Sequence, residues 1–355
     1  MGELRLMKGN EALAEAAIRA GMDAYFGYPI TPQSEVLEYL TREAYNRTQC
    51  TILQAESEIA AINMVYGASG VGARVLTTSS SPGISLMQEG LSYIAGAELP
   101  CLLVNINRGG PGLGTIQPSQ GDYFQAVKGG GHGDYHLIVL APATVQEMAD
   151  FVLDGWELAE KYRNPVLILA DGALGQMMEK VELRDQQTRG IRPVPPWATV
   201  GKSNDRERNV ITSLFIKPEE MEEVNLRLQA KYREVEKNEV RVEEINTEDA
   251  EFVLVAYGLS ARISRKVMEM LQQDGIKVGL IRPITLWPYP YAAIAAAAEH
   301  AKGFFVLELN AGQMVQDVRL GVNGRCRVEQ YGRMGGIIPS PEEVAEIARK
   351  MYSTL

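Results

Sequence analysis

Four short segments combine side chains that could bind a ligand or move a proton with prolines and glycines that shape the backbone. Each segment follows or ends an apolar run typical of a buried strand. In open α/β sheets, ligands bind beyond the carboxyl ends of the strands, so the polar residues of these segments are candidates for binding a ligand. The segments are Gly27–Pro32, Gln54–Ala61, Thr77–Gly83 and Asn107–Thr115.

Glu58 is the carboxylate of greatest interest among them. It stands where a predicted strand runs into a helix rich in alanine and glycine, and small residues allow close helix packing, so we expect this carboxylate to be at least partly buried. Burying a carboxylate is costly unless it has a partner or a chemical task. Glu56, two residues earlier, needs only to complement the positive end of that helix.

Arg108 is the cation that stands out in the same way. It follows the predicted strand Cys101–Asn107 and precedes Gly109 and Gly110, which let the backbone approach a ligand closely. A guanidinium at the end of a strand is well suited to gripping a carboxylate. The alternative is a surface arginine in a mobile loop.

Two of the segments present hydroxyl groups. Pro29 and Pro32 stiffen a turn that displays Thr31, which either caps a helix beginning at Pro32 or faces a ligand. Ser79–Ser81 stand between a predicted strand and a Pro-Gly pair, where they either cap the next helix or hold a polar ligand. The residues alone leave both alternatives open in each segment.

The chain offers no obvious nucleophile of its own. It has no G-x-S-x-G, no G-x-x-x-x-G-K-S/T and no H-E-x-x-H motif, and the glycines after Arg108 do not complete a dinucleotide-binding G-x-G-x-x-G. An enzymatic function therefore needs an organic cofactor that supplies the reactive centre.

The composition excludes several classes of protein. The 45 Asp and Glu residues outnumber the 35 Lys and Arg residues, and the net charge of −10 argues against a nucleic-acid partner. Cys50, Cys101 and Cys326 are too far apart for a disulfide framework, a zinc ribbon or an iron–sulfur ligand run. Because the sequence has no signal peptide and no apolar run of about 20 residues, we expect a soluble, cytoplasmic protein without membrane association.

The elements that must position these residues follow a βαβ pattern. Apolar bursts alternate with longer amphipathic stretches, which predicts the α/β class, and the bursts are continuous, which indicates a parallel sheet buried on both faces. The expected strands are Asp23–Tyr28, Thr51–Gln54, Arg74–Thr78, Cys101–Asn107, His136–Leu140 and Pro165–Ala170. The expected helices are Asn10–Ala20, Glu58–Ser69, Ile84–Ala97 and Val145–Tyr162.

Three regions are expected along the chain. Residues 1–185 form a first α/β domain, residues 186–249 a charged, proline-containing linker region, and residues 250–355 a second α/β domain. Within the linker, the charged stretch Glu219–Glu244 is expected to form a solvated helix that bridges the domains or, alternatively, to dock a partner. The second domain is expected to contain strands Glu251–Tyr257, Lys277–Ile281, Phe304–Leu309 and Cys326–Gln330 and a last helix Pro341–Met351.

Taken together, the four segments resemble the alpha-type subunit of the 2-oxoacid:ferredoxin oxidoreductases in order and spacing. The resemblance extends over nearly the whole chain, because Glu251–Pro290 and Glu308–Gln316 are similar to that family's transketolase C-terminal-like domain. It implies a thiamine-diphosphate pyrimidine-binding domain with a parallel sheet over residues 1–185 and a transketolase C-terminal-like α/β domain over residues 250–355. The motifs that carry it are Tyr28–Pro32, Glu56–Ala61, Ser81–Gly83 followed by Leu86–Glu89, and Arg108–Pro111.

The same resemblance implies roles for single residues. Glu58 corresponds to the catalytic carboxylate that faces N1′ of the cofactor's aminopyrimidine ring and shares a proton with it. Arg108 is implied to pair with the substrate carboxylate, and Thr31 to hydrogen-bond a substrate oxygen. Pro29 and Ser81 are implied to shape the cofactor pocket.

One signature of thiamine-dependent enzymes is absent. These enzymes bind the diphosphate through Gly-Asp-Gly and a downstream Asn, whereas this chain has Ala170-Asp171-Gly172. The resemblance therefore implies that this chain ligates no metal and that a beta-type subunit holds the diphosphate and Mg²⁺. The 4Fe–4S clusters are likewise expected on partner subunits, with gamma and ferredoxin-like subunits as further partners.

The implied reaction is the oxidative decarboxylation of a 2-oxoacid with coenzyme A to an acyl-CoA and CO₂, with electrons passed to ferredoxin. The run Gly112–Tyr123 looks more like the branched-chain (2-oxoisovalerate) subtype than the 2-oxoglutarate subtype, which typically has Ser-Thr-Gly after the proline. The alternatives are a 2-oxoglutarate:ferredoxin oxidoreductase subunit, a non-redox thiamine-diphosphate enzyme and a non-catalytic assembly subunit.

Overall fold

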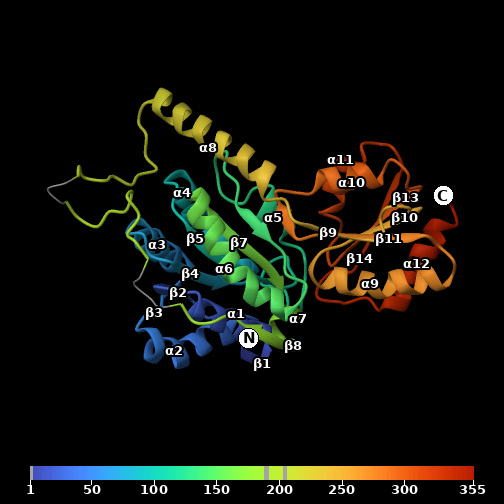
Figure 1. Cartoon of the computed structure of the whole chain (residues 1–355), viewed down its shortest axis with the longest axis horizontal. Helices are drawn as coiled ribbons and strands as arrows, with labels where there is room; N and C mark the ends of the chain where they lie inside the picture. Colours follow the sequence, from blue (N-terminus) through green and yellow to red (C-terminus); the bar gives the residue numbers. More distant parts are fainter. Residues whose placement is uncertain (1–2, 188–191, 203–205) are drawn as a thin grey trace.

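The six strands predicted for the first domain join a seventh, unpredicted strand in one sheet. We describe a computed structural model, which covers residues 3–187, 192–202 and 206–355 (Figure 1). The strands are β2 (Ala24–Gly27), β3 (Thr51–Gln54), β4 (Val75–Ser79), β5 (Cys101–Asn107), β6 (Ile138–Leu140), β7 (Pro165–Asp171) and β12 (Thr285–Trp287). Their order is β12-β6-β7-β5-β4-β2-β3, with β12 antiparallel to β6 and the other pairs parallel.

The two central strands determine where the carboxyl edge of this sheet lies. β5 and β7 pair in parallel from Cys101 opposite Pro165 to Asn107 opposite Asp171. Both strands are buried along their whole length. For these two strands, this confirms the prediction of parallel strands with both faces covered, whereas the edge strand β3 is mostly exposed. Arg108 follows β5 directly and so lies at the carboxyl edge.

Helices cover both faces of the first sheet. Two helices lead the chain toward the β3 edge of the sheet: α2 (Ser34–Thr48) connects β2 to β3, and α6 (Val145–Tyr162) connects β6 to β7. Two others lead it toward the β12 edge: α3 (Glu58–Gly70) connects β3 to β4, and α4 (Ser81–Gly96) connects β4 to β5. Right-handed crossovers therefore place the two pairs on opposite faces. α1 (Gly9–Arg19) packs against α2 and α6. α3 and α4 approach so closely that a Cβ on Gly90 would lie 2.6 Å from the Ile62 side chain.

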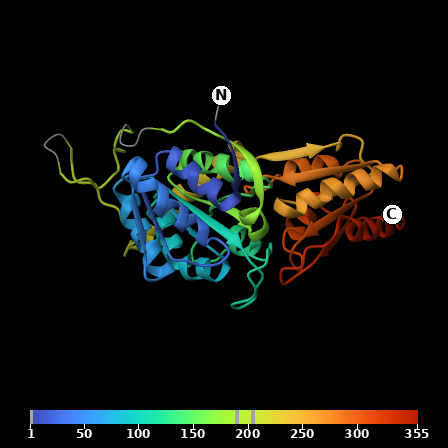
Figure 2. The same ribbon diagram turned by 90° about the horizontal axis from the view of Figure 1, so that it is seen from below.

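The second domain is built on a five-stranded sheet and lies beside the first domain (Figure 2). Its strands are β9 (Val242–Ile245), β10 (Phe252–Val255), β11 (Val278–Pro283), β13 (Gly303–Glu308) and β14 (Arg327–Gly332). Their order is β14-β13-β10-β11-β9, with β9 antiparallel to β11 and the other pairs parallel. α9 (Gly258–Gln273) packs against α12 (Pro341–Tyr352), and α10 (Tyr291–Ala297) packs against α11 (Val315–Val322).

The turn after β2 differs from its prediction. α2 begins at Ser34 with Gln33 as its N-cap residue, so a helix starting at Pro32 and capped by Thr31 is wrong. The backbone N–H of Gln33 donates to the carbonyl of Ile30 at 3.0 Å, which closes a turn ahead of the helix. Thr31 is exposed within this turn, and its side chain is not used by the helix.

A small two-stranded sheet adds to the predicted elements. β1 (Glu3–Lys8) pairs antiparallel with β8 (Met178–Leu183), and Glu3 lies opposite Leu183. Both strands mix charged and apolar residues, and Leu4 and Leu6 of β1 are exposed. A search for continuous apolar runs therefore misses this pair.

The predicted linker contains a long helix and a strand of the second sheet. These elements are α8 (Pro218–Asn238) and β9, while residues 188–191 and 203–205 lie outside the described residues. The prediction of a solvated helix is wrong for one face of α8, because Leu228, Tyr232 and Val235 are buried in the larger hydrophobic core cluster, which includes residues of both domains. The side-chain amide of Gln229 also donates to the carbonyl of Asp134 at 2.8 Å.

β12 ties the two domains together. Thr285 and Trp287 pair with β6, so a strand from the second half of the chain forms an edge of the first sheet. The Trp287 ring stacks on His136 with 4.5 Å between ring centroids. The Arg282 guanidinium, which is buried in the second domain, donates to both carboxylate oxygens of Glu147 on α6 at 2.8 and 2.6 Å.

Asp171 forms a second junction between the domains. Its Oδ1 accepts hydrogen bonds from the N–H groups of Ala173 and Leu174 at 2.8 and 3.1 Å, which caps the short helix α7 (Gly172–Gln176). The backbone N–H of Leu259, in the first turn of α9, is a further donor to this carboxylate. Burial nevertheless raises the pKa of Asp171 to about 6, because desolvation outweighs these hydrogen bonds.

The raised pKa of Asp171 predicts a pH-dependent stability. The folded chain holds a proton here that the unfolded chain releases near pH 3.8, so this contribution is complete below that pH and is lost as the pH rises through about 6. Compared with an Asp171→Asn variant, the wild type should gain about 1 kcal/mol of unfolding free energy between pH 7.5 and pH 5. Denaturant unfolding of both proteins at the two pH values measures this, and parallel pH dependences would contradict it.

Candidate functional site

Glu58 occupies the first position of α3, just beyond the carboxyl end of β3. Ser57 is the N-cap residue, and its hydroxyl accepts the N–H of Ala60 at 3.2 Å, which fixes the start of the helix. The Glu58 residue is only 5% exposed, whereas Glu56 is exposed. In the part of the chain that the structure describes, the Glu58 carboxylate has no hydrogen bond and no ion pair. A nearly buried carboxylate without a protein partner favours a ligand at this position.

Gly83 creates the space that the Glu58 carboxylate occupies. A Cβ on Gly83 would lie 2.4 Å from Glu58 Oε1 and 2.1 Å from the hydroxyl oxygen of Ser79, so only glycine fits without displacing both groups. The contact joins the start of α3, the end of β4 and the first turn of α4. Two of the four predicted segments, Gln54–Ala61 and Thr77–Gly83, therefore meet at this point.

Arg108 connects the other two segments, Asn107–Thr115 and the turn after β2. One Nη group donates to the carbonyl of Thr31 at 2.8 Å and the other to the carbonyl of Leu113 at 3.0 Å. The residue is 9% exposed, and its Nε is buried without an acceptor. The guanidinium is thus oriented by two backbone carbonyls, while its Nε–H has no acceptor. The structure brings Arg108 and Thr31 together, in agreement with the resemblance, which implies that both lie near the substrate.

Ser81 links Arg108 to the interior of the sheet. Its hydroxyl oxygen accepts the backbone N–H of Arg108 at 3.1 Å. The backbone N–H of Ser81 donates to Oδ1 of Asn105 at 3.2 Å, and Nδ2 of Asn105 donates to Oδ2 of Asp122 at 2.8 Å. Burial raises the pKa of Asp122, although the hydrogen bonds from Ser81 and Asn105 oppose this effect. Asn105 and Asp122 are therefore structural members of the site that sequence reasoning does not single out.

Buried polar atoms without a partner gather at the same edge of the sheet. They belong to residues at the ends of β4 and β5 and directly after β5, and each is cut off from solvent. Unpartnered buried polar groups are rare in native structures and need an explanation such as a missing ligand. The atoms are the Ser79 hydroxyl oxygen, Asn107 Nδ2 and Arg108 Nε.

Pro29 and Gln33 complete the turn after β2. Pro29 is exposed beside Thr31, in a position open to a ligand or a neighbouring chain. Gln33 is fully buried; its amide donates to the carbonyl of Tyr28 at 3.3 Å and accepts from the Thr78 hydroxyl at 2.6 Å. Gln33 therefore fixes the turn to β4. Its position between a proline and an amphipathic helix gives no hint of this role.

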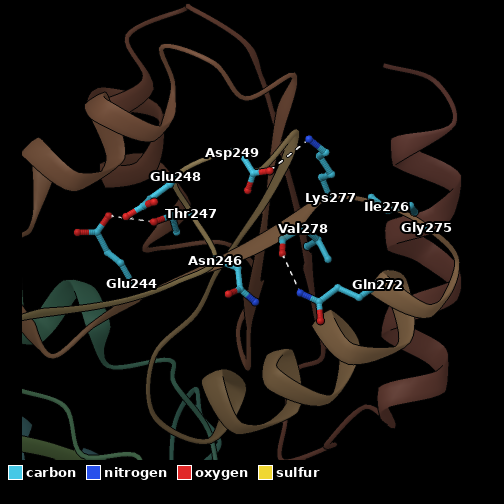
Figure 3. Close-up of a pocket in the computed structure, with 10 residues that line it drawn as sticks. All are labelled: Glu244, Asn246, Thr247, Glu248, Asp249, Gln272, Gly275, Ile276, Lys277 and Val278. Atoms are coloured by element: carbon cyan, nitrogen blue, oxygen red, sulfur yellow. Dashed lines mark hydrogen bonds and ion pairs between the residues drawn. The ribbon is translucent and has the colours of Figure 1, made fainter.

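A separate cavity of about 770 Å³ lies in the second domain, between the β9–β10 and α9–β11 turns (Figure 3). Lys277 pairs with Asp249 at 3.2 Å, and the Thr247 hydroxyl contacts Glu244 at 3.4 Å. None of the predicted site residues lines this cavity. Its lining residues are Glu244, Asn246, Thr247, Glu248, Asp249, Gln272, Gly275, Ile276, Lys277 and Val278.

Residues 3–187, 192–202 and 206–355 contain neither a candidate metal centre nor a helix that could span a membrane. No group of three or more His, Cys, Asp or Glu side chains is arranged there to hold a metal ion. No helix in these ranges is both long enough and apolar enough to cross a membrane. Cys50 and Cys101 are buried free thiols, and Cys326 is a partly exposed one.

Family comparisons match both domains. Residues 15–247 match the description "pyruvate flavodoxin/ferredoxin oxidoreductase, thiamine diP-bdg". Residues 250–344 match "pyruvate:ferredoxin oxidoreductase core domain II". The first match contains all five predicted site residues and the network around them.

Individual proteins are also similar in sequence to almost the whole of this chain. Ketoisovalerate oxidoreductase subunit VorB of Methanothermobacter marburgensis is 51% identical over 348 residues, covering 98% of this chain and 97% of the relative. 2-Oxoglutarate synthase subunit KorA of Methanothermobacter thermautotrophicus is 35% identical over 376 residues, covering 99% and 100%.

A solved structure, 2-oxoglutarate:ferredoxin oxidoreductase from Magnetococcus marinus with 2-oxoglutarate, coenzyme A and succinyl-CoA bound, is also similar. It matches with a TM-score of 0.85 and 28% identity over 98% of this chain. The match covers 65% of the chain in that structure, so this chain spans about two thirds of its length.

Proposed function

This chain belongs to the pyruvate flavodoxin/ferredoxin oxidoreductase family, and on that premise we propose that it is one subunit of a thiamine-diphosphate-dependent 2-oxoacid:ferredoxin oxidoreductase. The proposed reaction is the oxidative decarboxylation of a 2-oxoacid with coenzyme A, with electrons passed to ferredoxin. Both the matched family and the relatives named as subunits support this proposal.

The observation that carries the proposal is the buried Glu58 carboxylate, which has no partner among the described residues. When bound, thiamine diphosphate supplies a carbon nucleophile and an electron sink for decarboxylation. Glu58 fits the aminopyrimidine end of this cofactor, because a sequestered carboxylate can hold a proton at the ring nitrogen N1′. Gly83 leaves room for the carboxylate, and the unpartnered Ser79 hydroxyl offers a further hydrogen bond.

Arg108 fits the carboxylate of a 2-oxoacid. Its two Nη groups are already oriented by the carbonyls of Thr31 and Leu113, and its Nε lacks an acceptor, so the guanidinium can receive an anion with little rearrangement. The exposed Thr31 hydroxyl is proposed to hydrogen-bond a substrate oxygen. Pro29 and Ser81 are proposed to line the cofactor side of the same site.

A partner subunit is proposed to complete the site. Asp171, which departs from the Gly-Asp-Gly signature only at the preceding Ala170, caps α7 with its carboxylate and is 2% exposed, so it is not free to hold a metal. Ile59 lies next to Glu58 at the start of α3, Leu86 lies three residues after Gly83 in α4, and they are 51% and 49% exposed. Exposed apolar residues around an incomplete site fit a subunit interface.

The other components follow from the same proposal. A beta-type subunit would carry the diphosphate site and Mg²⁺, and 4Fe–4S clusters would lie on partner chains, with gamma and ferredoxin-like subunits in the assembly. The three free thiols agree with a reducing, cytoplasmic location.

The substrate is proposed to be a branched-chain 2-oxoacid such as 2-oxoisovalerate. The loop after Arg108 has no Lys or Arg between Gly109 and Tyr123 that could pair with a second substrate carboxylate. Leu113 and Ile116 of this loop are exposed apolar side chains. The 51% identical ketoisovalerate subunit supports this choice, and the 35% identical 2-oxoglutarate subunit makes 2-oxoglutarate the second candidate.

Substrate competition in the co-purified complex tests the proposal. We expect viologen reduction that requires coenzyme A, with kcat/KM for 2-oxoisovalerate at least about tenfold above that for 2-oxoglutarate, because an apolar loop leaves the second carboxylate unpaired. The reverse preference would identify a 2-oxoglutarate enzyme. Turnover without an electron acceptor would identify a non-redox thiamine enzyme, and tight thiamine diphosphate binding by this chain alone would contradict a shared site.

A further inference from the structure

The segment Gln117–Phe124, named here the connecting segment, joins the site to the second domain. At one end it lies against Arg108, whose backbone forms an isolated antiparallel bridge with Pro118. The backbone N–H of Gly109 donates to the carbonyl of Gln117 at 3.0 Å, which extends this contact. At its other end the segment enters α5 (Tyr123–Val127). One stretch of chain therefore contacts both the proposed substrate-binding arginine and the second domain.

Gln120 is buried at 2% exposure and uses both ends of its side-chain amide on the second domain. Its Oε1 accepts the Ser260 hydroxyl at 2.7 Å and the backbone N–H of Leu309 at 3.0 Å. Its Nε2 donates to the carbonyl of Tyr257 at 2.9 Å. The Gln120 backbone N–H donates to the Leu309 carbonyl at 3.1 Å, and its carbonyl accepts Nδ2 of Asn310 at 2.8 Å.

The second domain is shaped to receive this side chain. Gly258 has a φ of +53°, and a Cβ at this position would lie 3.2 Å from Gln120 Nε2. Gln313 extends the attachment, because its amide donates to the carbonyl of Gly121 and accepts the N–H of Phe124, both at 2.8 Å. The connecting segment is therefore held in place by groups of the second domain.

On its other side the connecting segment reaches the site through Asp122. The carboxylate accepts Nδ2 of Asn105, the Asn105 oxygen accepts the N–H of Ser81, and the Ser81 hydroxyl accepts the N–H of Arg108. These three hydrogen bonds run in series from the connecting segment to the backbone of Arg108. The hydrogen bonds that Asn105 and Ser81 make lie within the first domain. Asp122 joins them to the connecting segment, which Gln120 attaches to the second domain.

We infer that Gln120 is a positioning residue for the reaction, which fixes the connecting segment to the second domain and thereby holds Ser81 and Arg108 in the orientation that receives the 2-oxoacid. The identity of that ligand rests on the proposed function, whereas the hydrogen-bond path does not. A carboxylate of the same shape at position 120 would replace the donor that faces the Tyr257 carbonyl with an oxygen and would bury a charge. The connecting segment would then separate from the second domain.

The test compares three variants in the assembled complex. Gln120→Glu removes the donor, Ser260→Ala removes one partner of Gln120 at lower cost, and Gln273→Glu alters the exposed glutamine at the end of α9 as the matched control. Hydrogen exchange at the backbone amides of Ser81 and Arg108 reads out the path directly, because both amides are links in it. Steady-state kinetics supply KM and kcat for the 2-oxoacid.

For Gln120→Glu we expect about tenfold faster exchange at the Ser81 and Arg108 amides and about a tenfold higher KM, with kcat changed less than about threefold. Ser260→Ala should change the same quantities in the same direction by a smaller factor, and it decides the question if the first variant does not assemble. Faster exchange confined to the connecting segment, with Ser81, Arg108 and KM unchanged, would overturn the inference. Faster exchange at Ser81 and Arg108 in a complex that turns over no 2-oxoacid would support the inference and contradict the proposed function.

Discussion

Replacing Glu58 with alanine is expected to lower turnover of the assembled complex by at least about 10²-fold, the scale of a lost general acid–base contribution. The carboxylate is buried at the start of α3 and meets no partner among the described residues, so the substitution removes the group proposed to hold a proton at the aminopyrimidine. Viologen reduction by the purified complex with 2-oxoisovalerate and coenzyme A measures this loss, and the thiamine content of the same sample shows whether the cofactor is still bound.

Stability distinguishes a catalytic from a structural role for Glu58. Because a buried carboxylate without a protein partner costs free energy, the Glu58→Ala complex should unfold at the wild-type temperature or above it. Glu56→Ala, which removes an exposed carboxylate two residues away, should retain full turnover. Retained turnover in the Glu58 variant would instead identify a non-catalytic assembly subunit.

Replacing Arg108 with lysine is expected to raise KM for the 2-oxoacid by about 10- to 10²-fold, which corresponds to one or two lost charge-assisted hydrogen bonds. A single ammonium group cannot hold the carbonyls of Thr31 and Leu113 and also present a planar pair of donors to a carboxylate. Initial rates measured over a range of 2-oxoacid concentrations give this change directly.

Arg227→Lys is the matched control for this substitution. Arg227 is an exposed arginine on α8 that pairs with Glu98 at 2.7 Å, away from the strand ends, and its replacement should leave KM unchanged. If Arg108→Lys also left KM unchanged, Arg108 would be a structural arginine that only ties two loops together.

Several strands and helices could be predicted because their residue types carry the information locally. The strands β3 and β5 and the helix α6 begin and end at the residues predicted for them. β12 is only three residues long and pairs with a strand far away in the sequence, so no local pattern reveals it. The buried face of α8 was not predicted for a related reason, because charged residues outnumber the apolar residues along this helix.

The site residues also fall into those that could be predicted from the sequence and those that could not. Glu58 and Arg108 stand out because a charge at the end of an apolar strand is locally unusual, and the structure places both in nearly buried positions. The importance of Gly83 depends on a close approach between α3 and α4, and that of Gln120 depends on partners about 140 to 190 residues further along the chain. Contacts between distant segments set both roles, and a single sequence does not record such contacts.

β12 also determines where this polypeptide can be cut. A fragment that ended before Thr285 would leave the outer edge of β6 open, with unpaired N–H and C=O groups ready to pair with another molecule. A fragment that began at the second domain would carry β12 without its neighbour. Halves of the chain produced separately are therefore expected to self-associate, and any dissection of this protein has to keep Thr285–Trp287 together with the first sheet.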